Sequence, residues 1–173
     1  CFDMNAEYMD HLYECCQLNN KPIIMHIGRE PKSAAYNCDP YELCKAEKLE
    51  PVLENFPKLK ICVPHLGFSE TESYRKMIEK YDNLWLDTTM VICNYFPLQD
   101  QIDLNSFRED RIMYGSDFPN IPYAWDRELK ALKTLNLQKE KLQLLCHKNA
   151  AAFYNIEIVF CDDKISNNRS TIF

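Results

Sequence analysis

Short apolar runs alternate along the chain with longer stretches in which apolar residues recur every three or four positions. The runs are typical of strands buried in a parallel sheet, and the recurring pattern predicts amphipathic helices. Because each pair of parallel strands needs a crossover helix, strict alternation predicts a parallel α/β fold. The predicted strands are residues 23–26, 59–63, 84–88 and 111–117, and the predicted helices are residues 3–19, 39–56, 69–81, 123–135 and 139–154.

Several residues mark where these helices begin or break. Asp3 is a candidate N-cap, and Pro40 suits the first position of the second helix. Pro51 should break or restart that helix after Glu50. Residues 69 and 72 have the spacing of a capping box, Ser followed by Glu. We expect residues 90–109 to hold a loop and a short helix.

Charge is spread along the chain rather than clustered. The 173 residues carry a formal net charge of −6, and the basic residues are scattered. A nucleic-acid groove needs clustered Lys and Arg to neutralise phosphates, and an acidic balance disfavours anionic membrane surfaces. We therefore expect neither nucleic acid nor a membrane as a partner.

The nine cysteines do not indicate a disulfide framework. Their number is odd and no CxxC pair occurs, which also argues against a zinc ribbon. Free thiols are typical of a reducing compartment, so a cytoplasmic location is predicted. No apolar run reaches about 18 residues and no signal peptide is recognisable. Because the chain begins with Cys1, we expect a processed chain or part of a longer gene product.

Polar side chains end all four predicted strands: His26, His65, Asp87 and Asp117. In parallel α/β folds these ends open onto one face, where active sites lie. Neutral imidazole and ionised carboxylate are ligands for zinc and similar ions, so a divalent-metal site is predicted. For Asp87, capping the next loop and contacting substrate are both open. Arg29 would suit a carboxylate substrate, with a solvated loop charge as the alternative.

Other polar residues have structural interpretations. His11 and His147 lie on predicted helices away from the strand ends and are expected to be surface or packing residues. Asn149 is expected to hydrogen-bond backbone where the last helix docks. One face of that helix is predicted to carry Leu142, Leu145, Cys146, Ala150 and Phe153.

Four segments in order resemble the amidohydrolase-2 family, the decarboxylase and lactonase branch of the amidohydrolases. They are KPIIMHIG (21–28), FPKLKICVPHLG (56–67), YGSDFP (114–119) and KNAA (148–151). The resemblance covers residues 3 to 156 and implies strands 5 to 8, the C-terminal half, of a TIM (β/α)₈ barrel. The tail from residue 157 to 173 is polar and is expected to lie outside this partial barrel domain.

The resemblance implies a role for each strand-end residue. His26 would match the strand-5 histidine, a metal ligand. His65 would match the strand-6 histidine, which binds or polarises the substrate or the attacking water. Asp117 would match the strand-8 aspartate, which lies beside the metal and carries the proton of the attacking water. One divalent ion, with zinc as the expected metal, and a homodimer are implied.

The implied activity is hydrolysis or non-oxidative decarboxylation of a small carboxylated or cyclic organic molecule. The family's His-x-His pair on strand 1 is absent, and a complete barrel typically needs about 250 residues, so the chain has at most half of the ligands. Two alternatives remain. One is a TatD-like metal-dependent deoxyribonuclease, which shares the strand-5 histidine and strand-8 aspartate. The other is a non-catalytic half-barrel, either a remnant or an assembly partner.

Overall fold

The centre of the molecule is a sheet of four parallel strands. The structure is a computed structural model that describes residues 3–27, 37, 39–93, 95 and 102–159. The strands are adjacent in chain order, with Ile61 beside Ile23 and beside Leu84, and Leu86 beside Ile112. They are β1 (Ile23–Ile24), β2 (Ile61–Val63), β3 (Leu84–Asp87) and β4 (Ile112–Met113). The predicted parallel α/β sheet is confirmed.

Helices precede the first strand, connect the strands and follow the last one. The α-helices are α1 (Glu7–Leu18), α2 (Pro40–Leu43), α3 (Glu50–Asn55), α4 (Thr71–Lys80), α5 (Arg127–Thr134), α6 (Lys139–Gln143) and α7 (Asn149–Tyr154). The 3₁₀ segments are η1 (Ala46–Lys48), η3 (Leu104–Ser106) and η4 (Glu109–Arg111), together with η2 (His65–Glu70), which residues 66–68 interrupt with a non-helical backbone. A π-helical turn, η5 (Leu144–Lys148), joins α6 to α7 without a break.

Proline marks the helix starts correctly, whereas the two predicted side-chain caps are wrong. Pro40 is the first residue of α2, and α3 restarts at Glu50, directly before Pro51. The Asp3 carboxylate accepts from the backbone N–H of Asn5, which forms a turn four residues before α1 begins. Helix α4 begins at Thr71 and not at residue 69, because residues 65–68 have a left-handed backbone that no helix can include.

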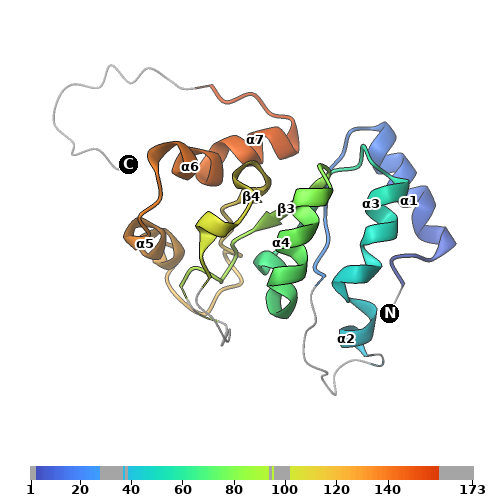
Figure 1. The fold of residues 1–173 in the computed structure, drawn as a ribbon, viewed down its shortest axis with the longest axis horizontal. Coiled ribbons are helices and arrows are strands. Elements are labelled where there is room, and N and C mark those ends of the chain that lie inside the picture. Colours follow the sequence, from blue (N-terminus) through green and yellow to red (C-terminus); the bar gives the residue numbers. More distant parts are fainter. Residues whose placement is uncertain (1–2, 28–36, 38, 94, 96–101, 160–173) are drawn as a thin grey trace.

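Each face of the sheet has its own core. One face carries Ile61, Val63, Leu84 and Leu86, which pack in a single cluster with side chains of α3 and α4. On the other face Cys62, Trp85 and Met113 pack with Phe153 of α7 in a second cluster. The Trp85 and Phe153 ring centroids are 5.7 Å apart, and the Lys60 ammonium donates to the Ala152 carbonyl. The strands therefore lie between α3 and α4 on one side and α7 on the other (Figure 1).

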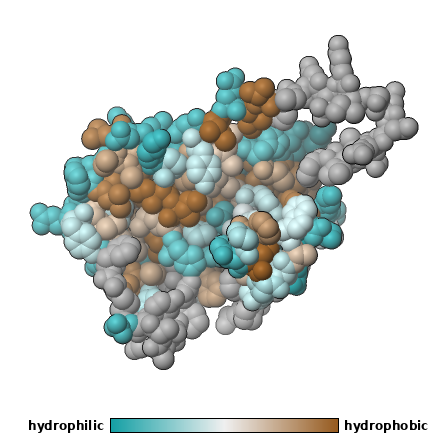
Figure 2. Space-filling view, turned by 180° about the vertical axis from the view of Figure 1, so that it is seen from behind, coloured by the Kyte–Doolittle hydropathy of each residue, from teal (hydrophilic) through white to brown (hydrophobic). Residues whose placement is uncertain are grey.

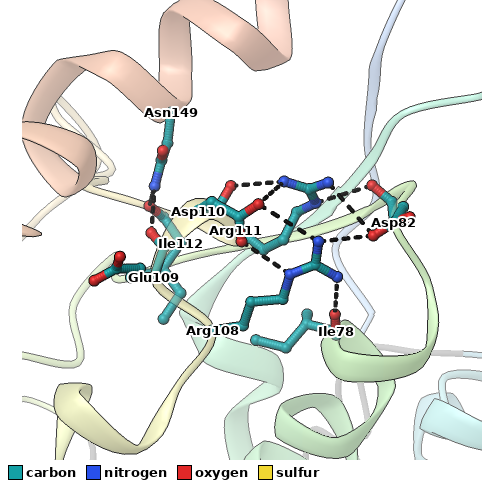
Figure 3. Close-up of polar contacts among 8 residues, drawn as sticks. All are labelled: Ile78, Asp82, Arg108, Glu109, Asp110, Arg111, Ile112 and Asn149. Atoms are coloured by element: carbon teal, nitrogen blue, oxygen red, sulfur yellow. Dashed lines mark hydrogen bonds and ion pairs between the residues drawn. The ribbon is translucent and has the colours of Figure 1, made fainter.

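A polar network ties the starts of β3 and β4 together (Figure 3). The Arg108 guanidinium donates to Asp82 at 2.7 Å, to Asp110 at 2.9 Å and to the Ile78 carbonyl at 2.9 Å. Arg111 also pairs with Asp110, at 2.6 Å. These charges lie at the amino-terminal ends of the strands, the end of an α/β barrel that serves stability rather than chemistry.

Asn149 fastens α7 to the same region. Its side-chain amide donates to the carbonyls of Glu109 and Ile112, each at 2.7 Å, and the residue is 3% exposed (Figure 3). The expectation that this asparagine bonds backbone where the last helix docks is confirmed.

Apolar side chains remain accessible on the side opposite the view of Figure 1. Figure 2 shows them gathered in a broad patch there. Among the exposed large apolar residues is Ile24 of the edge strand β1, which is 54% exposed. Among the described residues, no helix is long and apolar enough to cross a membrane. The six described cysteines are free thiols, as predicted: Cys15, Cys16, Cys44, Cys62, Cys93 and Cys146.

Candidate active site

A cavity of about 420 Å³ opens at the carboxyl ends of the four strands. His26, His65, Asp87 and Asp117 all line it, so the predicted convergence of strand ends is confirmed. Helix α7 contributes Ala150 and Tyr154 to the same wall. Sequence reasoning missed this contribution, because no pattern in the last helix shows on which side of the sheet it packs.

The two histidines lie against each other. Their Nε2 atoms are 3.0 Å apart, and their ring centroids are 4.9 Å apart at an interplanar angle of 78°. His65 is buried, with 8% exposed, whereas His26 faces the open cavity. Residues 39 positions apart in the chain thus present ring nitrogens to one point.

An unusual turn directs His65 into the cavity. His65 has φ 57°, and the next three residues are also left-handed, with Gly67 at φ 77°. Such a backbone is rare outside glycine and persists only where the surroundings enforce it. At Gly67 a Cβ atom would lie 1.8 Å from Cδ2 of Tyr74, so only glycine lets this turn pack on α4.

The hydrogen bond at Nδ1 fixes the tautomer of His65. Nδ1 lies 2.9 Å from the carbonyl oxygen of Thr89. A carbonyl can only accept, so Nδ1 carries the proton. In the neutral imidazole the lone pair is then at Nε2, the atom that faces His26. Such a bond at the remote nitrogen is how metal-binding histidines are oriented.

Asp87 caps the loop after β3 and also lines the cavity. Its Oδ1 accepts from the backbone N–H of Thr89 at 3.0 Å and of His65 at 3.3 Å. The Cys62 thiol donates to Oδ2 at 3.8 Å. Burial, followed by the charge of Asp87, raises the pKa of this thiol, so it stays protonated. Of the two interpretations left open by the sequence, loop capping is confirmed.

Asp117 lies on the cavity wall in a left-handed conformation. Its φ is 58°, and its carbonyl accepts from the Asn120 N–H at 2.8 Å, closing a turn after β4. Aspartate tolerates this backbone better than most residues. Across residues 3–27, 37, 39–93, 95 and 102–159, no three His, Cys, Asp or Glu side chains are close enough to hold one ion. The predicted metal and proton-transfer roles of Asp117 stay predictions.

The histidine pair fits part of a metal site. Two nitrogens bound to one zinc ion at about 2.05 Å in tetrahedral geometry lie about 3.3 Å apart, close to the separation in the structure. Two donors fill two of the four usual positions. Arg29, the predicted contact for a substrate carboxylate, lies outside the described residues.

The sequence of the chain matches one known protein family. The sequence profile of the amidohydrolase family matches residues 3–156. The chain belongs to the amidohydrolase family. This amidohydrolase match covers all four strands, the cavity and α7, and it confirms the resemblance drawn from the sequence.

Solved structures similar to this amidohydrolase chain confirm the fold. An uncharacterised TIM-barrel protein from Bordetella bronchiseptica is 24% identical, with a TM-score of 0.70 over 88% of this chain and 52% of that chain. The 5-carboxyvanillate decarboxylase of Novosphingobium aromaticivorans, solved with manganese and 4-hydroxy-3-methoxy-5-nitrobenzoic acid, is 16% identical, with a TM-score of 0.61 over 90% of this chain and 53% of that chain. A zinc-bound amidohydrolase from Burkholderia multivorans is 11% identical, with a TM-score of 0.65 over 89% and 59% of the two chains.

The chain spans little more than half the length of these structures. Its four parallel strands therefore correspond to about half of a TIM-barrel fold, as predicted. A search of curated proteins finds no match.

Proposed function

We propose that this chain supplies half of the active site of a metal-dependent hydrolase or non-oxidative decarboxylase. The observation that carries the proposal is the 3.0 Å separation of the His26 and His65 Nε2 atoms at the cavity shared with Asp117. The family match over residues 3–156 favours this function over a TatD-like deoxyribonuclease.

The residues of the chain have distinct parts in such a site. His26 would hold the ion through Nε2, and the short distance between the rings favours His65 as a second ligand rather than in the substrate-binding role expected from the sequence. A divalent ion there would lower the pKa of water towards about 7 and polarise a carbonyl or carboxylate oxygen. Asp117, exposed on the cavity wall, would accept a proton from the attacking group or return it to the product. The Thr89 carbonyl keeps the His65 proton on Nδ1, away from the reacting centre.

The cavity suits a small organic acid. Its volume of about 420 Å³ lies within the range of small-molecule sites. Burial raises the pKa of Tyr154, so its hydroxyl stays protonated and can donate to a substrate carboxylate. Similar structures were solved with 4-hydroxy-3-methoxy-5-nitrobenzoic acid and with 2,6-dihydroxybenzoate. A small carboxylated or cyclic compound is the proposed substrate class.

The remaining ligands have to come from outside the described residues. The chain spans 52% of the Bordetella bronchiseptica structure, so a further segment or another chain would complete the site. Similar structures carry manganese or zinc, and zinc is the metal proposed here. A homodimer, a cytoplasmic location and a domain boundary near residue 156 remain predictions.

Metal titration tests the proposal. Calorimetry with Zn²⁺ should detect one site on the chain, and His26→Ala or His65→Ala should each weaken binding by at least about tenfold. His11→Ala, on the exposed surface of α1, is the matched control and should bind as the unmodified chain does. Equal affinities for all four proteins would refute the proposed site.

A non-catalytic half-barrel is the second candidate. It is favoured by the lack, among the described residues, of three donors close enough to share an ion. If the chain binds no Zn²⁺ in the titration, this second candidate is the function to pursue.

A further inference from the structure

Three hydrogen bonds form a closed ring between the ends of β2 and β3. The backbone N–H of His65 donates to Asp87 Oδ1 at 3.3 Å, and the backbone N–H of Thr89 donates to the same oxygen at 3.0 Å. The ring closes where His65 Nδ1 donates to the Thr89 carbonyl at 2.9 Å. One carboxylate oxygen thus holds both the backbone of His65 and the loop residue that orients its imidazole.

We propose that Asp87 is a positioning residue that locks His65 as the Nδ1–H tautomer with Nε2 directed at His26. Asp87 acts through backbone groups. It fixes the place of the Thr89 carbonyl relative to the His65 ring, and that carbonyl selects the tautomer. The tautomer of His65 follows from the hydrogen bonds alone. Only the expected effect of Asp87 on metal binding rests on the proposed function.

The backbone around the ring needs such an anchor. His65 and Met90, which precede and follow Asp87 in the sequence, both have left-handed φ values, 57° and 59°. Such conformations cost about 1–3 kcal/mol each unless the surroundings enforce them. An acceptor shared by His65 and Thr89 holds both turns, whereas two separate acceptors would let the turns shift independently.

The neighbouring strand leaves just enough room for this arrangement. At Gly115 a Cβ atom would lie 2.2 Å from Thr89 Oγ1 and 3.0 Å from Asp87 Oδ1. Because residue 115 is glycine, the side chains of Asp87 and Thr89 can pack directly against the backbone that follows β4. The hydrogen-bonded ring therefore lies between the end of β2 and the chain that follows β4, and this packing restricts its geometry.

The type of residue at position 87 follows from these contacts. The acceptor must be short, because it bonds the N–H two residues ahead in its own chain while reaching the adjacent strand end. It must offer an oxygen with two lone pairs, since two N–H groups share Oδ1. Asparagine meets both requirements, alanine meets neither, and glutamate carries the oxygen one methylene too far.

Histidine tautomers can be read directly by nitrogen NMR. In the ¹⁵N-labelled chain, long-range proton–nitrogen correlation should show His65 protonated at Nδ1. Asp87→Ala should lower the ratio of the Nδ1–H to the Nε2–H form by about 5- to 10-fold, the effect of losing one hydrogen bond. Asp87→Asn should retain the ratio, because it keeps the acceptor oxygen.

A matched control isolates the effect. Asp103 accepts from the backbone N–H of Asn105 at 2.9 Å, the same two-residue spacing, in an exposed turn outside the cavity wall. Asp103→Ala should leave the His65 spectrum unchanged. If Asp87→Ala fails to fold, Asp87→Glu replaces it, with the same fall in ratio expected.

Two results would overturn the proposal: a proton on Nε2 of His65 in the unmodified chain, or an unchanged ratio in the alanine or glutamate variant. A lowered tautomer ratio in Asp87→Asn would also overturn the proposal, because the charge of residue 87 would then matter more than its acceptor oxygen. Zn²⁺ titration of the same samples separates this inference from the proposed function. Weaker binding in Asp87→Ala, by about 10- to 100-fold, supports both. If no sample binds Zn²⁺ while the tautomer responds as expected, the proposed function fails and the positioning role stands.

Discussion

Replacing Asn149 by alanine should destabilise the fold by about 2–4 kcal/mol. The side chain is 3% exposed and donates two hydrogen bonds of 2.7 Å, to Glu109 and Ile112. Each bond contributes about 1 kcal/mol net, and a buried carbonyl left without its donor costs about 1–3 kcal/mol. The Ile112 carbonyl is the one that stays buried, so its penalty of about 1–3 kcal/mol replaces the net value of that bond, and about 1 kcal/mol for the Glu109 bond brings the total to about 2–4 kcal/mol.

Urea unfolding at neutral pH measures this cost. For a chain of this size an m-value of about 2 kcal/mol/M converts the loss into a fall of about 1–2 M in the unfolding midpoint. Fluorescence of Trp85, whose ring packs on Phe153 of α7, reports the transition in a Trp125→Phe background. Trp125 is 61% exposed, so this background change removes signal with little effect on stability.

Two further variants decide whether the reasoning holds. Asn149→Asp keeps the shape but turns carboxylate oxygens towards two carbonyls, and it should cost at least as much as alanine. Asn105→Ala, at an exposed position, should shift the midpoint by less than about 0.5 kcal/mol. A cost below about 1 kcal/mol for Asn149→Ala, at an unchanged m-value, would refute the claim that these bonds hold α7 in place.

Three more predictions test other parts of the molecule. Gly115→Ala should cost about 1–3 kcal/mol in thermal or urea unfolding, because the new Cβ would lie 2.2 Å from Thr89 Oγ1, and an unchanged melting temperature would contradict the tight packing there. Arg108→Ala should cost more than about 1 kcal/mol, whereas Lys130→Ala, which breaks an ion pair whose lysine is 72% exposed, should cost less than about 0.5 kcal/mol; equal costs would contradict the network in Figure 3. Burial raises the pKa of the Cys62 thiol above its usual value of 9.0, so the stability that the protonated thiol contributes is complete below that pH and falls as the pH rises above it. Cys62→Ala should flatten the loss of stability above about pH 9 in urea titrations, and an unchanged pH dependence there would refute this assignment.

The strands and the convergence of their ends were predictable from the sequence. A buried parallel strand is an uninterrupted apolar run, and its end is visible when that run meets a histidine or an aspartate, as at His65 and Asp87. The predicted end at Asp117 was wrong, because β4 ends at Met113 and Asp117 follows in a turn. Parallel strands bring all such ends to one edge, so no long-range information was needed to group these residues in one cavity.

The contacts that orient these residues were not predictable. The Thr89 carbonyl and the shared Oδ1 of Asp87 act through backbone geometry, which residue types do not encode. The failed helix caps at residues 3 and 69 have the same cause, since a side chain caps only if the backbone next to it is correctly placed.

The last helix shows how one local irregularity misleads a periodic pattern. The sequence predicted a single apolar face from Leu142 to Phe153. In the structure Leu145 belongs to the core shared with α3 and α4, whereas Phe153 belongs to the core on the other side of the sheet. The π-helical turn Leu144–Lys148 adds a residue to one turn, which rotates the following helix by about 100°.

Helix α7 also spans the sheet from one margin to the other. Near its start Asn149 holds the carbonyl of Ile112 in β4, and just beyond its end the Asn155 amide donates to the Asn20 carbonyl, in the turn that precedes β1. The helix therefore works as a brace between the two outermost strands. Losing either contact would leave α7 tied to the sheet at one margin only, so these two asparagines hold the helix over the central strands.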